Sequence, residues 1–427
     1  MKVIKNDKQL QRSFLKELRE RDENKNANAQ AAVEQIIQRV KSLGDEALLE
    51  YTKAFDKVEL ESLEVDKNKI AEALDKISPE LLQAMKDSAK NIREFHEKQL
   101  TQSFVIADEG RVTGQRVRAL SRVGIYVPGG TAAYPSSVLM NAIPAKVAGV
   151  KEIIMVTPPD KNGSVRNDIL AAAAIAGVDR IFCVGGAQAV AALAYGTQTI
   201  PRVDKITGPG NIFVATAKRL VYGIVDIDMI AGPSEILVIA DSSAKPEFLA
   251  ADLLSQAEHD PMAASILLTD SEEIAFETQK EIEKQLEKLE RKDIAKKSIE
   301  DFGAILVCDN IDTCCEISDE IAPEHLEIMT QNPFDYLGKI NNAGSVFLGQ
   351  YSPEPLGDYF AGANHVLPTS GTARFFSPLS TNDFMKKSAY IYYSKDALEK
   401  VADKIEIFAQ SEGLTAHKNS ITIRKGK

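Results

Sequence analysis

The sequence predicts an α/β fold built on parallel β-sheets. From about residue 123, short apolar runs recur along the chain, and each is followed by an alanine-rich stretch of helical character. Strand–loop–helix alternation of this kind is typical of a parallel sheet with helices on both faces. The runs are continuous and do not alternate with polar residues, as expected for strands that are buried on both sides.

The part of the chain before these strands is predicted to be helical. Apolar residues at helical spacing indicate one helix, which Gly44 ends. These residues are Val33, Ile36, Ile37, Val40 and Leu43. Ser78 and Pro79 predict the start of another helix, with serine at the cap and proline in the first turn. Its buried stripe is predicted to comprise Leu81, Met85, Ile92 and Phe95.

Apolar runs that end in glycine, proline or polar residues predict the strands. They lie at 124–127, 153–156, 181–184, 205–207, 236–240, 266–269, 304–308 and 346–348. Near the C-terminus, an amphipathic pattern predicts a separate helix that stops near Gly413 and is followed by a short tail. Its apolar residues are Leu398, Val401, Ile405 and Phe408. A helix with such a face must dock on its own chain or on another subunit.

Length and composition restrict the class of protein. The 427 residues are enough for two or three domains. A net charge of −11 argues against a nucleic-acid or anionic-membrane partner. We expect no secretory peptide at the N-terminus and no span of the bilayer. The four cysteines show no CxxC spacing, so no disulfide framework is expected and a cytoplasmic location is predicted.

Histidine is informative because the chain has only five. His96 lies beside the apolar stripe of a helix and is predicted to be a surface or boundary residue. The other four, His259, His325, His365 and His417, lie in polar segments or beside glycine and proline. Imidazole is a favoured metal ligand and a base near neutral pH. For each of these four histidines taken alone, the alternative to a functional role is a structural role as a hydrogen-bonded residue.

Gln256 and His259 are predicted to share one face at the last turn of a helix that ends before Pro261. This arrangement can present an amide oxygen and an imidazole nitrogen to one metal ion. Two ligands do not complete a zinc site, so others must come from elsewhere. Asp358, on a predicted Pro/Gly loop, and His417, on the tail, are candidates. The alternative for Gln256 is an exposed helical residue.

Glu324 and His325 are adjacent, directly after Pro323. Oxidation of an alcohol needs a base for the hydroxyl proton, and oxidation of an aldehyde needs a base that activates water. A histidine and a glutamate in one cleft can divide these tasks. The alternative is a surface glutamate beside a capping histidine.

Three glycine-containing turns connect predicted strands to helices. They are Pro128-Gly129-Gly130, Gly185-Gly186-Ala187-Gln188 and Gly208-Pro209-Gly210-Asn211. Small residues there allow a phosphate to approach a helix N-terminus. There is no GxGxxG motif, but three such turns in one sheet indicate a cofactor site at the carboxyl ends of the strands. Cys183 lies within a predicted strand, so no thiol nucleophile is expected.

Ten segments, in order along nearly the whole chain, resemble those of histidinol dehydrogenases. They are 127–130, 185–189, 208–211, 231–235, 254–259, 323–326, 343–349, 357–359, 364–369 and 414–419. The resemblance implies an enzyme that oxidises L-histidinol through L-histidinaldehyde to L-histidine, the last two steps of histidine biosynthesis. NAD would be the co-substrate, and each subunit would hold one zinc ion.

The resemblance also implies roles for individual residues. The zinc ligands would be Gln256, His259, Asp358 and His417. His325 would be the base for the alcohol proton, and Glu324 would activate water for the aldehyde step. The substrate would contact Ser234, Gln256, His259, His325, Asp358, Glu412 and His417, with His365 as a plausible further contact. NAD would contact Tyr126, Gln188 and Asn211.

The architecture implied by the resemblance is two incomplete Rossmann-like domains with small terminal pieces, in an intertwined homodimer. Residues 1–22 would form an N-terminal helical extension. A discontinuous domain of residues 23–125 and 234–379 would carry zinc and the catalytic residues. The NAD-contacting domain would be inserted at 126–233. Residues 380–427 would form a helical tail exchanged between subunits, so that each active site is shared.

The sequence also raises three other possible functions. A zinc hydrolase could use Glu324 as the base on a water molecule. A dehydrogenase of the same fold could act on another amino or hydroxy sulfonate alcohol, because these motifs do not define the pocket for the substrate's side chain. A non-enzymatic binding module is the third, and the polar constellation argues against it.

Overall fold

The computed structural model describes residues 1–5, 8–21, 26–129 and 134–425. The chain divides into two compact units. The first comprises Met1–Gln99 and Leu120–Phe384, and the second comprises Leu100–Ala119 and Met385–Lys427. The predicted α/β fold with parallel sheets is confirmed, whereas the four-part domain division remains a prediction.

The larger sheet of the first unit, here called sheet A, has six strands, and all of them are parallel. Their order is β1 (Lys2–Lys5), β11 (Gly303–Val307), β10 (Ala264–Thr269), β9 (Glu235–Ala240), β12 (His325–Met329) and β13 (Ser345–Leu348). Strands β9 to β12 are fully buried, which explains their continuous apolar sequences.

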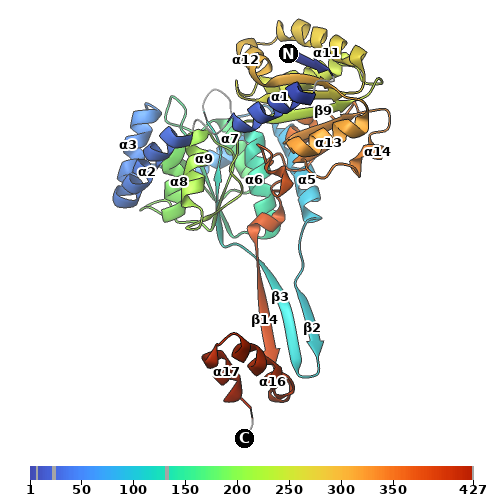
Figure 1. Cartoon of the computed structure of the whole chain (residues 1–427). Helices are drawn as coiled ribbons and strands as arrows, with labels where there is room; N and C mark the ends of the chain where they lie inside the picture. The colour runs from blue at the N-terminus through green and yellow to red at the C-terminus, as the bar shows by residue number, and fades with distance from the viewer. Residues whose placement is uncertain (6–7, 22–25, 130–133, 426–427) are drawn as a thin grey trace. The chain divides into compact units, whose positions relative to one another are not determined.

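Helices cover both faces of sheet A (Figure 1). One face packs against α10 (Pro246–Ala257), α11 (Glu272–Leu286) and α12 (Lys292–Phe302). The other packs against α1 (Lys8–Glu20) and α13 (Ile311–Ile321). The short helices α14 (Phe334–Leu337) and α15 (Glu354–Tyr359) flank β13 in the sequence. The two apolar cores fix the position of the strand ends.

The second sheet of this unit, sheet B, has five parallel strands. Their order is β6 (Arg180–Cys183), β5 (Glu152–Thr157), β4 (Arg122–Tyr126), β7 (Lys205–Thr207) and β8 (Asp226–Ile227). One core joins it to α2 (Asn26–Leu43), α3 (Asp45–Phe55), α8 (Gly186–Tyr195) and α9 (Ile212–Val221). The remaining helices are α4 (Lys67–Glu72), α5 (Pro79–Glu97), α6 (Pro135–Ala148) and α7 (Asn167–Ala176).

Apart from the edge strand β1, the two sheets share one strand order. From β9 in sheet A and from β4 in sheet B, the chain adds two strands on one side and then returns to the other side. The reversal lies between β9 and β12 in sheet A and between β4 and β7 in sheet B. This is the Rossmann order without its sixth strand, and such a reversal opens a crevice at the strand ends.

The eight predicted strands correspond to β4, β5, β6, β7, β9, β10, β11 and β13. Strands β1, β8 and β12 were not predicted. Strand β8 has only two residues, and β1 lies in a segment where charged and apolar residues alternate. Strand β12 was missed because Glu327 interrupts its apolar run; the buried Glu327 carboxylate accepts a hydrogen bond from the Glu354 amide at 2.8 Å.

Helix α5 begins as predicted, with the Ser78 hydroxyl accepting a hydrogen bond from the Leu81 amide. The predicted buried stripe is wrong at two positions, because Leu81 and Phe95 are 39% and 44% exposed. Helix α5 contacts α6, and His96 is among its buried residues. The prediction that His96 is a surface or boundary residue is therefore also wrong, because the residue is fully buried. Its Nδ1 donates to the Ile92 carbonyl at 2.7 Å, and the Asn364 side-chain amide donates to its Nε2 at 3.2 Å.

The second unit contains a three-stranded antiparallel sheet, which the sequence did not predict. Its order is β14 (Met385–Tyr393), β3 (Arg111–Ala119) and β2 (Phe104–Asp108). Helix α16 (Lys395–Ser411) follows β14 and leads to α17 (Thr415–Thr422), as Figure 1 shows. The predicted helix at 398–408 is confirmed as part of α16, whereas the short tail carrying His417 is helical.

Within the described parts of the chain, no helix combines the length and apolarity that crossing a membrane requires. The four cysteines are buried and free, in agreement with the expectation of no disulfide framework.

A buried ion pair holds the turn after β7. The Lys218 ammonium pairs with the Asp228 carboxylate, and both side chains are almost inaccessible to solvent. Lys218 also donates to the Gly208 carbonyl at 2.9 Å, and the Gly208 amide donates to Asp228 at 2.7 Å. Both backbone groups of Gly208 are therefore satisfied by one ion pair. Gly208 has φ +115°, and a Cβ there would lie 2.1 Å from the Tyr126 carbonyl oxygen, so only glycine fits this turn.

We expect Lys218→Met to lower the free energy of unfolding by about 3–5 kcal/mol, because it leaves the Asp228 carboxylate buried and unpaired. Chemical denaturation monitored by circular dichroism measures this loss. Lys146→Met is the matched control. Its partner Asp179 is 38% exposed, so we expect a loss below about 1 kcal/mol. Equal losses of unfolding free energy in Lys218→Met and Lys146→Met would contradict a special contribution of the buried Lys218–Asp228 pair to stability.

Candidate active site

The candidate catalytic residues lie at the amino edge of sheet A. Glu235 is the first residue of β9 and His325 is the first residue of β12, and the two strands are neighbours. Helix α10 returns from the carboxyl edge to this same edge, so its C-terminal end also reaches the site. The sequence predicted cofactor turns at the carboxyl ends of strands and did not indicate an edge for Glu324 and His325. In sheet A, the candidate catalytic residues lie at the amino edge.

The main chain of Glu235 anchors both candidate catalytic side chains. Its amide donates a hydrogen bond to Glu324 Oε2 at 2.9 Å. His325 Nδ1 lies 3.0 Å from the Glu235 carbonyl oxygen. Because a carbonyl can only accept, Nδ1 carries the hydrogen in this contact. One residue thus orients a carboxyl group and an imidazole.

His325 has the properties of a base. It is buried, and burial lowers its pKa to about 4 in spite of the nearby Asp358 charge. The imidazole is therefore neutral at neutral pH. With Nδ1 protonated, Nε2 carries the lone pair, and this atom has no hydrogen-bond partner among the described residues. A neutral, oriented imidazole with a free Nε2 can accept a proton from a bound substrate.

Glu324 is buried beside it. Burial raises the pKa of its carboxyl group well above the ordinary value, and the charges of Glu235, Asp358 and Glu354 raise it further, while the Glu235 amide opposes the shift. A carboxyl group with a raised pKa is suited to exchange protons near neutral pH. The alternative of a surface glutamate beside a capping histidine is wrong, because both side chains are buried.

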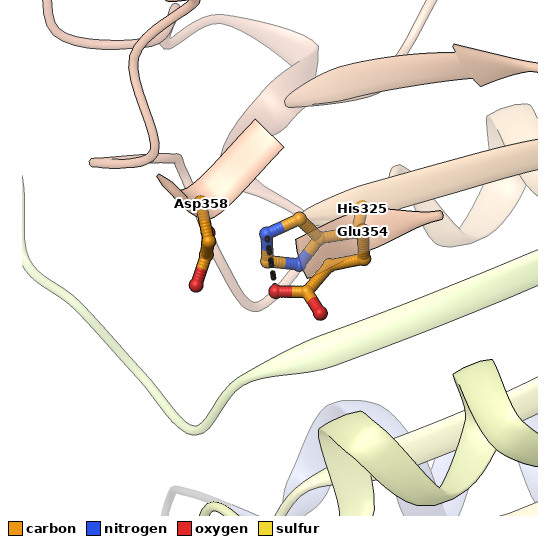
Figure 2. Close-up of side chains that lie close together, drawn as sticks. All are labelled: His325, Glu354 and Asp358. Carbon is orange, nitrogen blue, oxygen red and sulfur yellow. Dashed lines mark ion pairs between the residues drawn. The ribbon is translucent and has the colours of Figure 1, made fainter. Parts of the chain in front are cut away.

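Figure 2 shows Asp358 and Glu354 beside the His325 imidazole. One ligand-type atom from each of these three residues lies within 4.8 Å of the other two. Glu354 Oε1 is 4.0 Å from His325 Nε2. Glu354 was not predicted from the sequence, although its spacing of four from Asp358 places both residues on one helical face. The prediction of a loop at Asp358 is wrong, since Pro355 lies in the first turn of α15, where proline is tolerated.

Asp358 is held in its charged form. Burial opposes ionisation, but a hydrogen bond from His365 and electrostatic interactions with His365, His325 and His259 outweigh it, so the pKa of Asp358 is lowered. His365 Nδ1 lies 3.5 Å from Asp358 Oδ1. Three of the four histidines that the sequence singled out therefore interact with the Asp358 carboxylate.

Gln256 and His259 lie at the end of α10. The helix ends at Ala257, and the His259 amide donates to the Gln256 carbonyl at 3.2 Å in the turn that follows. The predicted shared helical face is therefore wrong, because His259 lies beyond the helix. The alternative of an exposed Gln256 is also wrong, since the residue is 1% exposed.

The donor set fits a zinc ion. The buried Gln256 Oε1 has no hydrogen-bond partner among the described residues, and such an atom is costly unless a ligand satisfies it. A carboxylate and an imidazole, from Asp358 and His259, are donor types that zinc accepts.

Glu412 and His417 belong to the second unit. Glu412 caps the C-terminus of α16, and His417 lies in the first turn of α17. Both side chains are exposed within the described structure. Their participation in the site stays a prediction.

The residues predicted to contact NAD lie at the carboxyl edge of sheet B. Tyr126 ends β4, Gln188 is in the first turn of α8, and Asn211 caps α9 by accepting from the Phe213 and Val214 amides. The Tyr126 hydroxyl accepts from the Gly186 amide at 3.0 Å, and burial raises its pKa to about 12, so it remains protonated.

Gln188 Oε1 is buried without a hydrogen-bond partner in the described part of the chain. The edge therefore offers a hydroxyl donor, an unsatisfied amide oxygen and two helix N-termini, which suit a dinucleotide. Of the first glycine turn, Gly130 lies outside the described residues. Ser234 immediately precedes β9, and its carbonyl accepts from the Ala264 amide at 3.0 Å.

The chain matches the histidinol dehydrogenase family over residues 19–425. It belongs to the histidinol dehydrogenase family. A histidinol dehydrogenase from Clostridium acetobutylicum is 60% identical over 412 residues, which is 96% of each chain. One from Listeria innocua is 56% identical over 414 residues, covering 96% of this chain and 97% of that one.

A solved structure gives the same result. The crystal structure of histidinol dehydrogenase from Elizabethkingia anophelis has a TM-score of 0.94 and 42% identity, covering 99% of this chain and 98% of that chain. The resemblance found in the sequence is confirmed, and membership of the histidinol dehydrogenase family supports an oxidoreductase function.

Loss of an outer-shell contact weakens metal binding by about 10–100-fold. We expect His259→Ala to weaken zinc binding by more than this, because it removes a ligand. Metal content after dialysis against a graded series of chelator concentrations measures the change. Asp260→Asn is the control, because an asparagine oxygen can still accept from the Met262 amide and preserve the turn. A His259→Ala protein that retains zinc as well as Asp260→Asn would refute His259 as a ligand.

Proposed function

We propose that the protein is an NAD-dependent histidinol dehydrogenase that oxidises L-histidinol through L-histidinaldehyde to L-histidine. The observation that carries this proposal is the anchoring of Glu324 and His325 on the main chain of one residue. The two side chains sit beside Asp358, in a site where two successive proton transfers can occur. Family membership supports histidinol as substrate and histidine as product.

In the first oxidation, we assign the hydroxyl proton of histidinol to His325 Nε2. The carbon bearing the hydroxyl loses a hydride, and the two electrons of the C–H bond leave with it. The His325 Nδ1 hydrogen bond to the Glu235 carbonyl keeps Nε2 unprotonated and oriented before this step. The products of the step are the aldehyde and one protonated base.

In the second oxidation, we assign activation of water to Glu324. Its carboxylate takes a proton as the water oxygen bonds to the aldehyde carbon. The adduct is the hydrate anion, because the water proton has moved to Glu324. A second hydride leaves the carbon as the anionic oxygen forms the carbonyl bond of the acid. Two hydrides, and thus four electrons, leave in total. The Glu235 amide stabilises the carboxylate form of Glu324 that must accept the proton.

Gln256, His259, Asp358 and His417 would hold one zinc ion per subunit, and Ser234, His325 and Glu412 would complete the substrate contacts with them. Bound zinc would orient the substrate and polarise its oxygen. Tyr126, Gln188 and Asn211 would bind NAD, which accepts the hydride. The unsatisfied amide oxygens of Gln256 and Gln188 support these two assignments.

We further propose that the enzyme is a cytoplasmic homodimer in which Glu412 and His417 of one subunit act in the site of the other. The apolar surface of the second unit supports this proposal. Ile391, Ile407 and Phe408 are 70–75% exposed within the described structure, which favours their burial by another subunit. Phe408 belongs to the apolar face that the sequence predicted for this helix.

The activity itself is tested by NADH absorbance on mixing the purified protein, NAD and L-histidinol. We expect two NADH per histidinol consumed when NAD is in excess, because two oxidation levels separate the alcohol from the acid. Prolonged incubation with a chelator should abolish the reaction, and added zinc should restore it. A ratio of one, with aldehyde accumulating, would contradict the four-electron assignment.

The two catalytic assignments predict different kinetic defects. Loss of a base costs about 10²–10⁴-fold in rate. His325→Ala should slow alcohol oxidation by this factor, while Glu324→Gln should chiefly slow oxidation of supplied histidinaldehyde. Rapid-mixing measurements of each half-reaction distinguish them. Equal slowing of both half-reactions by Glu324→Gln would indicate a structural role.

Sharing of the site between subunits predicts complementation. His259→Ala and His417→Ala should each be inactive alone. After subunit exchange, a heterodimer would contain one site with both substitutions and one with neither, so activity should return to mixtures. Exchange proven by native mass spectrometry of differently tagged subunits, without recovered activity, would exclude a shared site.

A further inference from the structure

We infer that Arg21 is a positioning residue for both catalytic side chains and that it acts through Glu235. This inference rests on the proposed roles of Glu324 and His325. It assigns to the N-terminal segment a catalytic contribution, in addition to its part in the fold.

The N-terminal segment is firmly attached to sheet A. Strand β1 pairs in parallel with β11, and α1 buries Phe14, Leu15 and Leu18 in the core on one face of the sheet. Arg21 directly follows α1, and its side chain is 1% exposed. The packing of the helix therefore delivers a buried guanidinium to the sheet edge where β9 begins.

The guanidinium contacts the chain on both sides of Ser234. Arg21 Nη2 donates to Glu235 Oε1 at 2.5 Å and to the Pro233 carbonyl at 3.3 Å. The Glu235 side chain is 7% exposed, so this ion pair is shielded from water on both sides. A contact to a carboxylate and a nearby carbonyl fixes both the side chain and the main chain of the segment 233–235.

Glu235 transmits this constraint to the site. Its amide holds Glu324 at 2.9 Å, and its carbonyl holds the His325 imidazole at 3.0 Å. A shift of the Glu235 peptide groups would therefore displace both catalytic side chains together. Without the guanidinium, the buried Glu235 carboxylate would also lose this ion pair, with its negative charge close to Glu324.

The effect on rate follows from these contacts. A misplacement of about 1 Å at a reacting group can cost about 10²-fold in rate. Arg21 does not contact Gln256, His259 or Asp358 in the described structure, so zinc binding should be insensitive to it. The expected signature is a fall in kcat for both half-reactions at unchanged zinc content.

The experiment compares Arg21→Met with the wild type as zinc-loaded enzyme. We expect kcat to fall by about 10²-fold in alcohol and in aldehyde oxidation, with KM for histidinol within roughly twofold. Arg21→Lys restores one donor and a positive charge, and should recover at least about tenfold of the loss. The double variant Arg21→Met/Glu235→Gln removes the Glu235 charge together with the guanidinium, and should be faster than Arg21→Met alone.

A matched control separates positioning from a general loss of stability. Arg180 also pairs with a glutamate, Glu64, through two hydrogen bonds of 2.7 Å, but it lies at the start of a strand of sheet B. Arg180→Met should lower the melting temperature and leave kcat per zinc-loaded subunit unchanged. Should Arg21→Met fail to fold, Arg21→Lys and the double variant provide the same comparison.

The outcomes distinguish this inference from the proposed function. If the wild type does not reduce NAD with histidinol, the proposed function fails. If the wild type is active and is impaired by Glu324→Gln and His325→Ala, but Arg21→Met has the kcat of the wild type, only the role of Arg21 fails. A loss in Arg21→Met that appears solely as reduced zinc content would likewise overturn it.

Discussion

The pairing of β9 with β12 at the centre of sheet A is the constraint on which the site depends. This pairing sets His325, at the start of β12, in register with Ile236, the residue after Glu235. At this edge, the Glu235 amide and carbonyl hydrogen-bond the side chains of Glu324 and His325. Rigid main-chain groups, held by two apolar cores, are therefore the donors and acceptors that orient the catalytic pair.

Apart from β1, sheets A and B share one strand order, but they use different edges for their proposed ligands. In sheet B, the carboxyl edge carries the glycine turns and helix N-termini, whose partial positive charge suits phosphates. In sheet A, the amino edge carries the catalytic residues, because α10 brings its C-terminal end there and β12 begins there. A helix C-terminus carries partial negative charge, which suits a cation better than a phosphate. The choice of edge thus agrees with the ligand proposed for each sheet.

Burial of ionisable groups is concentrated around the site. Besides Glu324, the neighbouring acids Asp252, Glu327 and Glu354 lie in or beside sheet A. Burial raises the pKa of Asp252 to about 6 and that of Glu354 to about 8, and it raises the pKa of Glu327 well above its ordinary value. Asp358, by contrast, has a lowered pKa because of its interactions with three histidines. The protein therefore favours the charged form of Asp358, whereas burial favours the neutral forms of Glu324, Glu327 and Glu354.

The sequence by itself determined the fold class, most strands and the family, because continuous apolar runs and ordered motifs are local properties of the chain. It also singled out Glu324, His325, Gln256, His259 and Asp358 as candidates. Only the tertiary structure decided that His96 is a buried structural residue, that Asp358 lies on a helix, and that Glu354 joins the site. Arg21 and Glu235 could not be found from the sequence, because their contact spans 214 positions. Their roles come from strand pairing and helix docking, which are set by contacts between segments that no local pattern records.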